Sequence, residues 1–151
     1  MLVNITLGFA LPWITAIYLI KKDLPVFLAV FPFVSMCAFV FDFLFFHAGW
    51  YIVEPYMPPH EMLPAFPFKI GIYPITGVLL IHTITSSKKK GHWYWLFLFA
   101  IVITALEGIA VHFERIHYGN NWNLFWTFAA YLFFMWLTFF YYEKLKKLMK
   151  S

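Results

Sequence analysis

The feature that most constrains this chain is a set of five apolar stretches, each about as long as a bilayer is thick. They cover residues 3–20, 24–47, 68–85, 93–113 and 122–142. A helix needs about 20 mostly apolar residues to cross the hydrocarbon core of a membrane. Charged residues make up only 12% of the 151 residues, whereas soluble domains carry about a quarter. The sequence therefore predicts an all-α integral membrane protein, residues 1–151 forming one bundle of five transmembrane helices.

The basic residues divide unequally between the connectors. If five helices cross the membrane in turn, connectors 21–23 and 86–92 and the C-terminal tail share one side. That side holds Lys21, Lys22, Lys88, Lys89, Lys90, Lys144, Lys146, Lys147 and Lys150. The other side holds only Lys69 and Arg115. Because cytoplasmic loops are enriched in Lys and Arg, we expect the N-terminus outside and the C-terminus inside, in a multi-pass protein of the plasma membrane.

The net charge of +4 comes from lysines in the connectors and the tail, where membrane topology accounts for them. Nucleic acid is therefore not expected as a partner. The long connector 48–67 is rich in proline but also in Tyr, Met, Leu and Phe. An irregular segment with many apolar side chains is expected to pack against the protein and not to extend freely into solvent. We predict that this segment forms a cap on the outer surface of the bundle.

Two acids interrupt apolar segments, Asp42 in FDFLFFHAGWY (41–51) and Glu107 in TALEGIAVH (104–112). An ionisable side chain in mid-membrane costs at least ~2.5–3.5 kcal/mol, so such residues face the bundle interior. At 1.5 Å per residue both acids reach the outer half of the bilayer. His47 and His112 each follow an acid by five positions.

These residues predict a ligand-binding pocket at the outer end of the bundle. Its expected members are Asp42, His47, Tyr73, Glu107, His112, Arg115, Tyr118 and Trp122. The alternative, in which both carboxylates only hydrogen-bond neighbouring helices, stays open. The similar order of acid, histidine, glycine and tryptophan also suggests a parallel repeat of helices 24–47/68–85 and 93–113/122–142.

The sequence offers little for metal or covalent chemistry. His47, His60, Glu61, His112 and His117 are the metal-ligand candidates, but no HxxH or HExxH spacing occurs, so neither metal nor cofactor is expected. There is no nucleophile elbow, phosphate loop or dinucleotide fingerprint. The candidates for a catalytic acid are Glu61 and Glu107.

The segments GIYPITGVLL and ALEGIAVHFERIHYGNNWNLFWTFAAYL resemble a family of small, functionally uncharacterised polytopic membrane proteins of spore-forming Firmicutes. In that family a Tyr-Pro pair opens one helix, and a Glu in the penultimate helix precedes a Tyr-x-x-x-Trp connector. The corresponding residues here are Tyr73, Pro74, Glu107, Tyr118 and Trp122. The resemblance implies a multi-pass membrane fold and no particular activity.

A second, weaker likeness concerns the stretch PPHEMLPAF, which is similar to a motif of membrane-embedded lycopene cyclase domains. Those domains carry a Pro-x-Glu-Glu motif, and here Glu61 stands alone in that position. The likeness implies an enzyme that protonates an isoprenoid, although the second carboxylate is missing.

Three functions therefore remain open. The first is binding or transport of a small hydrophobic, cationic or lipid-like ligand, without enzyme activity. The second is intramembrane acid–base catalysis on a lipid or isoprenoid, and the third is a structural or assembly subunit of the membrane. The lipid bilayer is the expected partner, and a homodimer is compatible with each reading.

Overall fold

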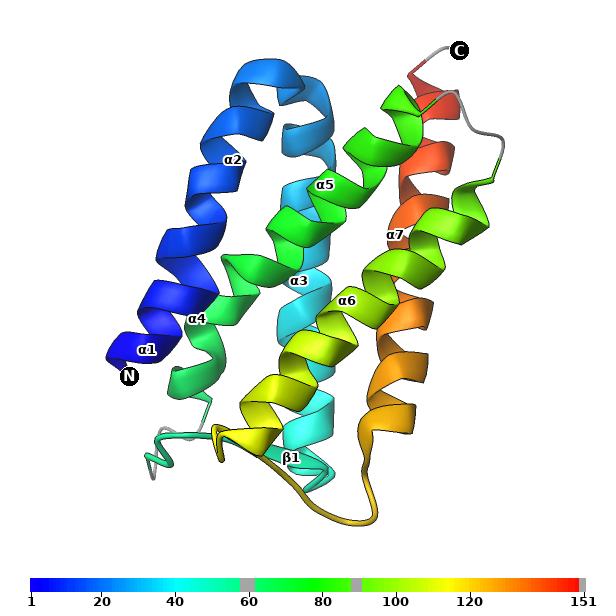
Figure 1. The fold of residues 1–151 in the computed structure, drawn as a ribbon. Helices are drawn as coiled ribbons and strands as arrows, with labels where there is room; N and C mark the ends of the chain where they lie inside the picture. Colours follow the sequence, from blue (N-terminus) through cyan, green and yellow to red (C-terminus); the bar gives the residue numbers. More distant parts are fainter. Residues whose placement is uncertain (58–61, 88–90, 150–151) are drawn as a thin grey trace.

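The computed structural model describes residues 1–57, 62–87 and 91–149. Within these residues the chain is about 80% helical and has five helices long and apolar enough to cross a membrane. They span Leu2–Lys22, Leu24–His47, Leu63–Ser86, His92–His112 and Leu124–Leu148. Successive spans run in opposite directions, as Figure 1 shows. The prediction of a helical fold with five helices able to cross a membrane is confirmed.

Several spans are built from shorter elements. The first comprises α1 (Leu2–Ile5), a π-helical turn (Thr6–Ala10) and α2 (Leu11–Lys22), and the second is α3 (Leu24–His47). The third comprises a 3-10 turn (Leu63–Ala65), α4 (Phe66–Lys69) and α5 (Ile72–Ser86). The fourth and fifth are α6 (His92–His112) and α7 (Leu124–Leu148).

Local sequence explains most of the helix ends. Pro25 stands in the first turn of α3, where a missing backbone N–H leaves no intrahelical hydrogen bond unmade, whereas Pro12 follows the π-helical turn Thr6–Ala10 inside the first span. Asn123 caps α7, since its side-chain oxygen accepts from the backbone N–H of Phe125 at 2.9 Å. The predicted end of this helix at residue 142 is wrong, because α7 continues to Leu148 through the good helix formers of EKLKKL.

The third span is broken, whereas a continuous helix over 68–85 was predicted. α4 ends at Lys69, Ile70 and Gly71 leave the helical conformation, and α5 begins at Ile72. The Trp13 indole N–H donates to the freed carbonyl of Ile70 at 3.0 Å. Gly71 lies against the first span so closely that a Cβ there would be 1.9 Å from the Gly8 carbonyl oxygen. The break coincides with a close backbone crossing, and Pro74, four residues after Ile70, has no N–H to bond the Ile70 carbonyl.

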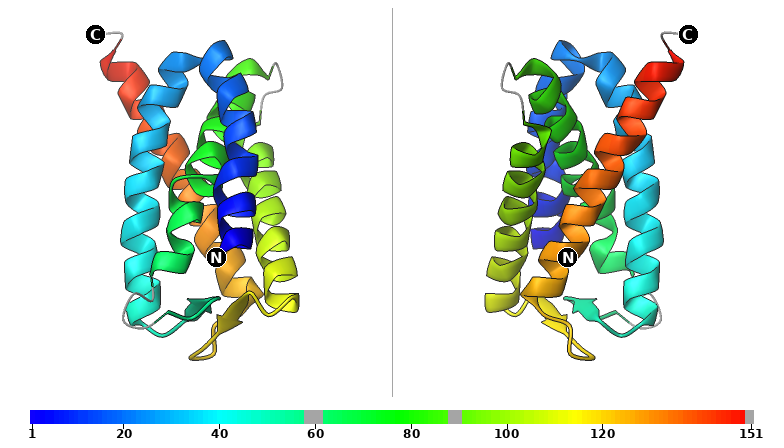
Figure 2. Two further views of the ribbon diagram at one scale, coloured as in Figure 1. Left: turned by 90° about the vertical axis from the view of Figure 1, so that its left-hand side faces the viewer. Right: turned by 90° about the vertical axis from the view of Figure 1, so that its right-hand side faces the viewer.

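α5 occupies the centre of the bundle and contacts α2, α3, α6 and α7. One core cluster joins it to α2 and α3 through Ala16, Leu19, Val30, Val34 and Val78, among others. A second joins it to α6 and α7 through Leu80, Leu96, Ile103 and Met135. Figure 2 shows the outer helices around it. Their outward faces expose large apolar side chains such as Ile14, Ile101 and Phe125, which suits contact with lipid.

The two connectors at the end of the bundle that holds the N-terminus form a β-ribbon, an addition to the expected all-α fold. β1 (Tyr51–Val53) pairs antiparallel with β2 (Ile116–Tyr118), and Ile52 lies opposite His117. Beyond the strands, the backbone N–H of Glu54 donates to the Arg115 carbonyl at 2.9 Å. The ribbon joins α3 to α6 across the mouth of the bundle (Figure 2).

Further contacts hold the ribbon in place. The indoles of Trp50 and Trp122 stack with their centroids 4.5 Å apart. The side-chain amide of Asn120 donates to the Ala48 carbonyl at 2.7 Å. Buried Asn4, in the first span, donates to the carbonyl of Glu54 at 2.8 Å. The described part of the predicted cap at 48–67 is thus packed against other elements.

Candidate functional site

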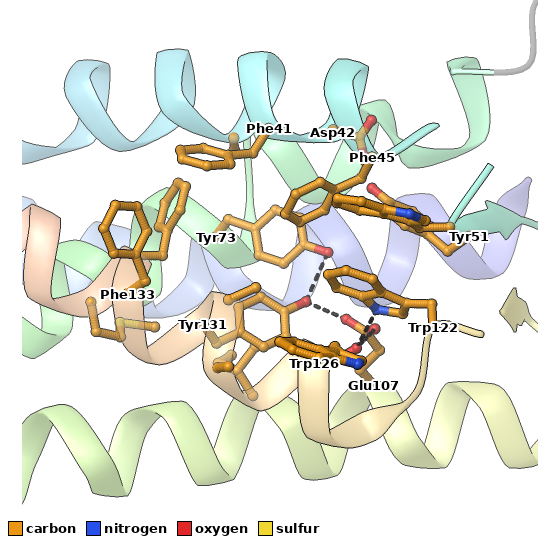
Figure 3. A pocket seen from close by; sticks show the side chains of 18 of the residues that line it. Phe41, Asp42, Phe45, Tyr51, Tyr73, Glu107, Trp122, Trp126, Tyr131 and Phe133 are labelled. Atoms are coloured by element: carbon orange, nitrogen blue, oxygen red, sulfur yellow. Dashed lines mark hydrogen bonds between the residues drawn. The ribbon is translucent and has the colours of Figure 1, made fainter. Parts of the chain in front are cut away.

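A cavity of about 360 Å³ lies between α3, α5, α6 and α7. Figure 3 shows its wall, which is mostly aromatic. The aromatic lining residues are Phe41, Phe45, Trp50, Tyr51, Tyr73, Trp122, Trp126, Tyr131, Phe133 and Phe134. Small-molecule pockets in proteins usually measure ~300–1,000 Å³ and are largely apolar with a few polar groups. In size and lining this cavity therefore suits a small organic ligand.

The cavity is elongated and its two ends differ in chemistry. Its lining residues on α7 run from Trp126 to Met135, which corresponds to a depth of about 13 Å at 1.5 Å per residue. Glu107 and Tyr51 lie at the end near the β-ribbon and Phe133 lies at the end deeper in the bundle (Figure 3), and Met135, further along α7, also lines the cavity. A polar end and an apolar end favour an amphiphilic occupant.

Glu107 carries the central polar contacts of the site. Tyr118 donates to one carboxylate oxygen at 2.7 Å and Thr127 to the same oxygen at 3.2 Å. Tyr131 hydrogen-bonds the other oxygen, as the dashed lines in Figure 3 show. Trp122 extends the network by donating from its indole N–H to the Thr127 hydroxyl at 2.9 Å. These donors come from α7 and the connector before it, so the fold surrounds the carboxylate with hydroxyl groups.

Tyr118, on the ribbon, is held as a neutral donor. Burial, and then the nearby Glu107 carboxylate, raise the pKa of Tyr118 above its usual value. Tyr118 therefore keeps its proton and remains a donor to Glu107 at neutral pH. The hydroxyl of Tyr131 lies 3.3 Å from that of Tyr73 and hydrogen-bonds with it. This link connects the carboxylate on α6 to the first turn of α5.

Asp42 reaches the same cavity but has a different partner. Its carboxylate forms an ion pair with Lys69, and both side chains are buried. Lys69 is the last residue of α4, directly before the break in the third span. Its ammonium also lies 5.2 Å from the centre of the Phe39 ring. The charge of Asp42 is thus compensated within the protein.

No such compensation exists for Glu107 in the described residues. The ion pairs found there join Lys69 to Asp42, His82 to Asp23 and His117 to Glu54. Glu107 takes part in none of them, and its bonding partners are all hydroxyl groups. When ionised, the carboxylate is well hydrogen-bonded but leaves the cavity with one unpaired negative charge.

The structure brings together five of the eight predicted pocket residues. Asp42, Tyr73, Glu107 and Trp122 line the cavity, and Tyr118 binds Glu107. His47, His112 and Arg115 have exposed side chains and are not among the lining residues.

The helical repeat explains why the two histidines lie elsewhere. Five residues rotate a helix by about 140° beyond a full turn, so an inward acid turns its histidine outward. The Nδ1 atom of His47 accordingly lies 3.0 Å from the carbonyl oxygen of Phe43 on its own helix. Over the described part of the chain, Arg115 pairs with neither Glu107 nor Glu114.

The metal candidates are not gathered into one site where they are described. No group of three His, Cys, Asp or Glu side chains within residues 1–57, 62–87 and 91–149 is placed to hold a metal ion. His117 lies 3.6 Å from Glu54 on the ribbon, while His47 and His112 end separate helices. His60 and the catalytic candidate Glu61 lie outside the described residues.

Sequence reasoning missed Lys69 and Thr127 as members of the site. Lys69 was counted only as one of two basic residues on the outer side. Its position among the apolar residues of AFPFKIGIY was a usable signal, because an isolated cation there needs a counter-charge. Thr127 gave no such signal, since a threonine in an apolar helix commonly bonds its own backbone.

Comparison of the chain with models of protein families, with curated proteins and with solved structures found no match.

Proposed function

We propose that this protein binds a small hydrophobic, cationic or lipid-like ligand in the aromatic cavity and moves it into or across the membrane. Glu107 is the main polar anchor, and Asp42, Tyr73, Tyr118 and Trp122 complete the binding site. The ribbon and the described part of connector 48–67 form its outer wall, because Trp50 and Tyr51 line the cavity.

The observation that carries this proposal is the setting of Glu107. A carboxylate in a membrane-spanning helix is costly, and such residues commonly mark ligand or ion pathways. Glu107 lines a cavity of about 360 Å³ instead of being packed over by side chains. A carboxylate that served only to join helices would not need an adjoining space of that size.

Two backbone irregularities support a transport role. Substrate sites of transporters are typically formed beside discontinuous helices. Here the third span is interrupted at Ile70 and Gly71, and Tyr73 in the following turn lines the cavity. The π-helical turn Thr6–Ala10 lies against this interruption, where Gly8 meets Gly71. π-Helical turns are frequent at functional sites.

The same proposal includes an orientation and a location. The end of the bundle with the β-ribbon faces the outside and the lysine-rich end faces the cytoplasm, in the plasma membrane. The spans 24–47/68–85 and 93–113/122–142 would be related as a parallel repeat. Support comes from Tyr73 and Tyr131, which stand in corresponding helices and meet at the cavity with hydroxyls 3.3 Å apart. A homodimer is compatible with this arrangement.

Native mass spectrometry of the purified protein tests the proposal. The wild type is compared with Glu107→Gln and with Glu114→Gln, an exposed carboxyl that serves as the charge-matched control. We expect a co-purified small molecule or lipid on the wild type and on Glu114→Gln, and its loss from Glu107→Gln. Identical spectra for all three, with lower thermal stability of Glu107→Gln alone, would instead make Glu107 a structural link between helices.

A further inference from the structure

We propose that the ligand of this cavity is a singly charged organic cation with an apolar, aryl-sized body. Its ammonium group would lie beside Glu107 and its body would point toward Phe133, Phe134 and Met135. This inference rests on the proposed function and names the chemical class of the ligand.

The net charge of the site indicates the sign of the ligand's charge. Asp42 and Lys69 cancel one another as a buried ion pair. Glu107 accepts hydrogen bonds from Tyr118, Thr127 and Tyr131 but has no ion-pair partner in the described residues. The ionised site therefore carries a charge of −1, since hydroxyl donors stabilise a carboxylate without neutralising it. One positive charge on the ligand would make the site neutral.

The lining of the cavity suits an organic cation better than a metal ion. A hard metal ion needs several oxygen ligands, and Glu107 is the one unpaired carboxylate among the described lining residues. Trp122 is joined to Glu107 through Thr127, and Trp126 lines the same cavity. Indole rings attract cations more strongly than the other aromatic side chains do, and the attraction is greatest where water is excluded. Ammonium groups carrying methyl or aryl substituents are the cations that such walls recognise.

The shape of the cavity indicates the size and apolar character of the uncharged part of the ligand. From Glu107 the space continues past Phe41 and Tyr73 toward Phe133 (Figure 3), and Phe134 and Met135 also line it. Its deeper end offers aromatic and thioether surface. An aryl or short alkyl group would fill this end, while the charged group stays at the polar end.

Two probes of the same shape separate charge from size. Benzyltrimethylammonium is a cation, and neopentylbenzene is its neutral isostere with carbon in place of nitrogen. Binding of each is measured by isothermal titration calorimetry to the protein in dodecyl maltoside, with empty micelles as the blank. This nonionic detergent avoids competition from charged lipid headgroups. Both probes are titrated into wild type, Glu107→Gln and Glu114→Gln.

We expect the wild type to bind the cation at least about tenfold more tightly than the isostere. Glu107→Gln should abolish this preference, and Glu114→Gln should keep it. If Glu107→Gln does not fold, Trp126→Leu replaces it, because Trp126 is half exposed. That variant should weaken binding of the cation more than binding of the isostere, so that the preference for the cation falls.

Other outcomes separate the inference from the proposed function. Equal affinities of both probes for the wild type, or a preference that survives Glu107→Gln, would overturn the cationic ligand and leave a ligand-binding cavity. Binding of neither probe would also overturn it. The proposed function itself fails only if native mass spectra of the three proteins are in addition identical.

Discussion

At the scale of single residues, the chain places two carboxylates in one cavity and stabilises them by different means. Asp42 has an opposite charge beside it, whereas Glu107 has hydroxyl donors around it. The charge of Asp42 is neutralised by Lys69, whereas the charge of an ionised Glu107 is not neutralised and can pair with a further cation. Under the proposed function, Asp42 mainly holds the third span and Glu107 mainly binds the ligand.

The ion pair leads to a prediction about stability. Lys69→Met removes the charge that faces Asp42 and leaves a carboxylate buried without a counter-ion. Breaking a buried pair from one side destabilises proteins by about 3–5 kcal/mol. We expect a loss of this size in the free energy of unfolding, measured by titration with sodium dodecyl sulfate and circular dichroism. Lys144→Met, on an exposed residue, should change the value little.

The double variant Lys69→Met/Asp42→Asn shows whether the buried charge is the cause. Removal of both charges should restore most of the stability that Lys69→Met loses. If the double variant is as unstable as the sum of the two single ones, the pair does not exist in the membrane.

At the scale of elements, the third span is the one that departs most from a simple helix. It is interrupted at Ile70 and Gly71, and the first span lies directly against the interruption. Trp13 supplies the hydrogen bond that the broken helix lacks. In a membrane, freed backbone groups need partners inside the protein, so the first span is required for the break.

The crossing predicts an effect of one added methyl group. In Gly71→Ala, the new Cβ would lie 1.9 Å from the Gly8 carbonyl oxygen, so the backbones must separate. We expect a loss of about 3 kcal/mol or more in the free energy of unfolding, at the upper end of overpacking effects. Gly108→Ala is the control, because its Cβ would lie 3.4 Å from the Leu124 side chain. Equal stability of the two variants would show that Gly71 and Gly8 are not in contact.

The β-ribbon is a second element that can be tested directly. Backbone hydrogen bonds join Gly119 to Trp50 and Glu54 to Arg115. Because hydrogen-bonded and non-hydrogen-bonded pairs alternate along an antiparallel ladder, Val53 and Ile116 form a non-hydrogen-bonded pair. Cα atoms of such pairs are about 4.5 Å apart, which suits a disulfide. In a Cys37→Ala background, Val53→Cys/Ile116→Cys should cross-link with mild oxidant, seen by gel mobility. Val53→Cys/His117→Cys, one residue out of register, should not; the reverse result would contradict the register.

At the scale of the whole molecule, the two ends of the bundle differ in charge and in structure. Lys21, Lys22, Lys144, Lys146 and Lys147 lie at one end, while the ribbon and the polar end of the cavity lie at the other (Figure 1). At the lysine end, His82 on α5 lies 3.0 Å from Asp23 and ties the first hairpin to the central helix.

This asymmetry predicts the orientation in the membrane. In a Cys37→Ala background, a membrane-impermeant maleimide should label Glu114→Cys in intact protoplasts. Lys147→Cys should be labelled only after the membrane is permeabilised, because the proposed topology places the lysine-rich end in the cytoplasm. Both positions have exposed side chains, so accessibility of the side chain itself does not limit the reaction. Labelling in the opposite order would reverse the proposed topology.

Five spans and their rough limits could be read from the sequence, because the length and hydrophobicity of a membrane helix follow directly from the bilayer. It also identified Asp42 and Glu107 as residues that need a polar setting, since a charge among apolar side chains is costly wherever the helix packs. The resemblance to small membrane proteins of Firmicutes and the function stay predictions.

The partners of those two carboxylates follow from the packing of the helices and not from the sequence. Lys69 and Asp42 are far apart in sequence, and their pairing depends on how α3 and α4 pack. The break at Gly71 depends on contact with Gly8, and the ribbon depends on two connectors meeting. Helix periodicity is a local property, whereas cavities, ion pairs and strand pairing depend on which helix faces oppose one another. For this reason Glu107 could be singled out from the sequence, but the aromatic cavity beside it could not.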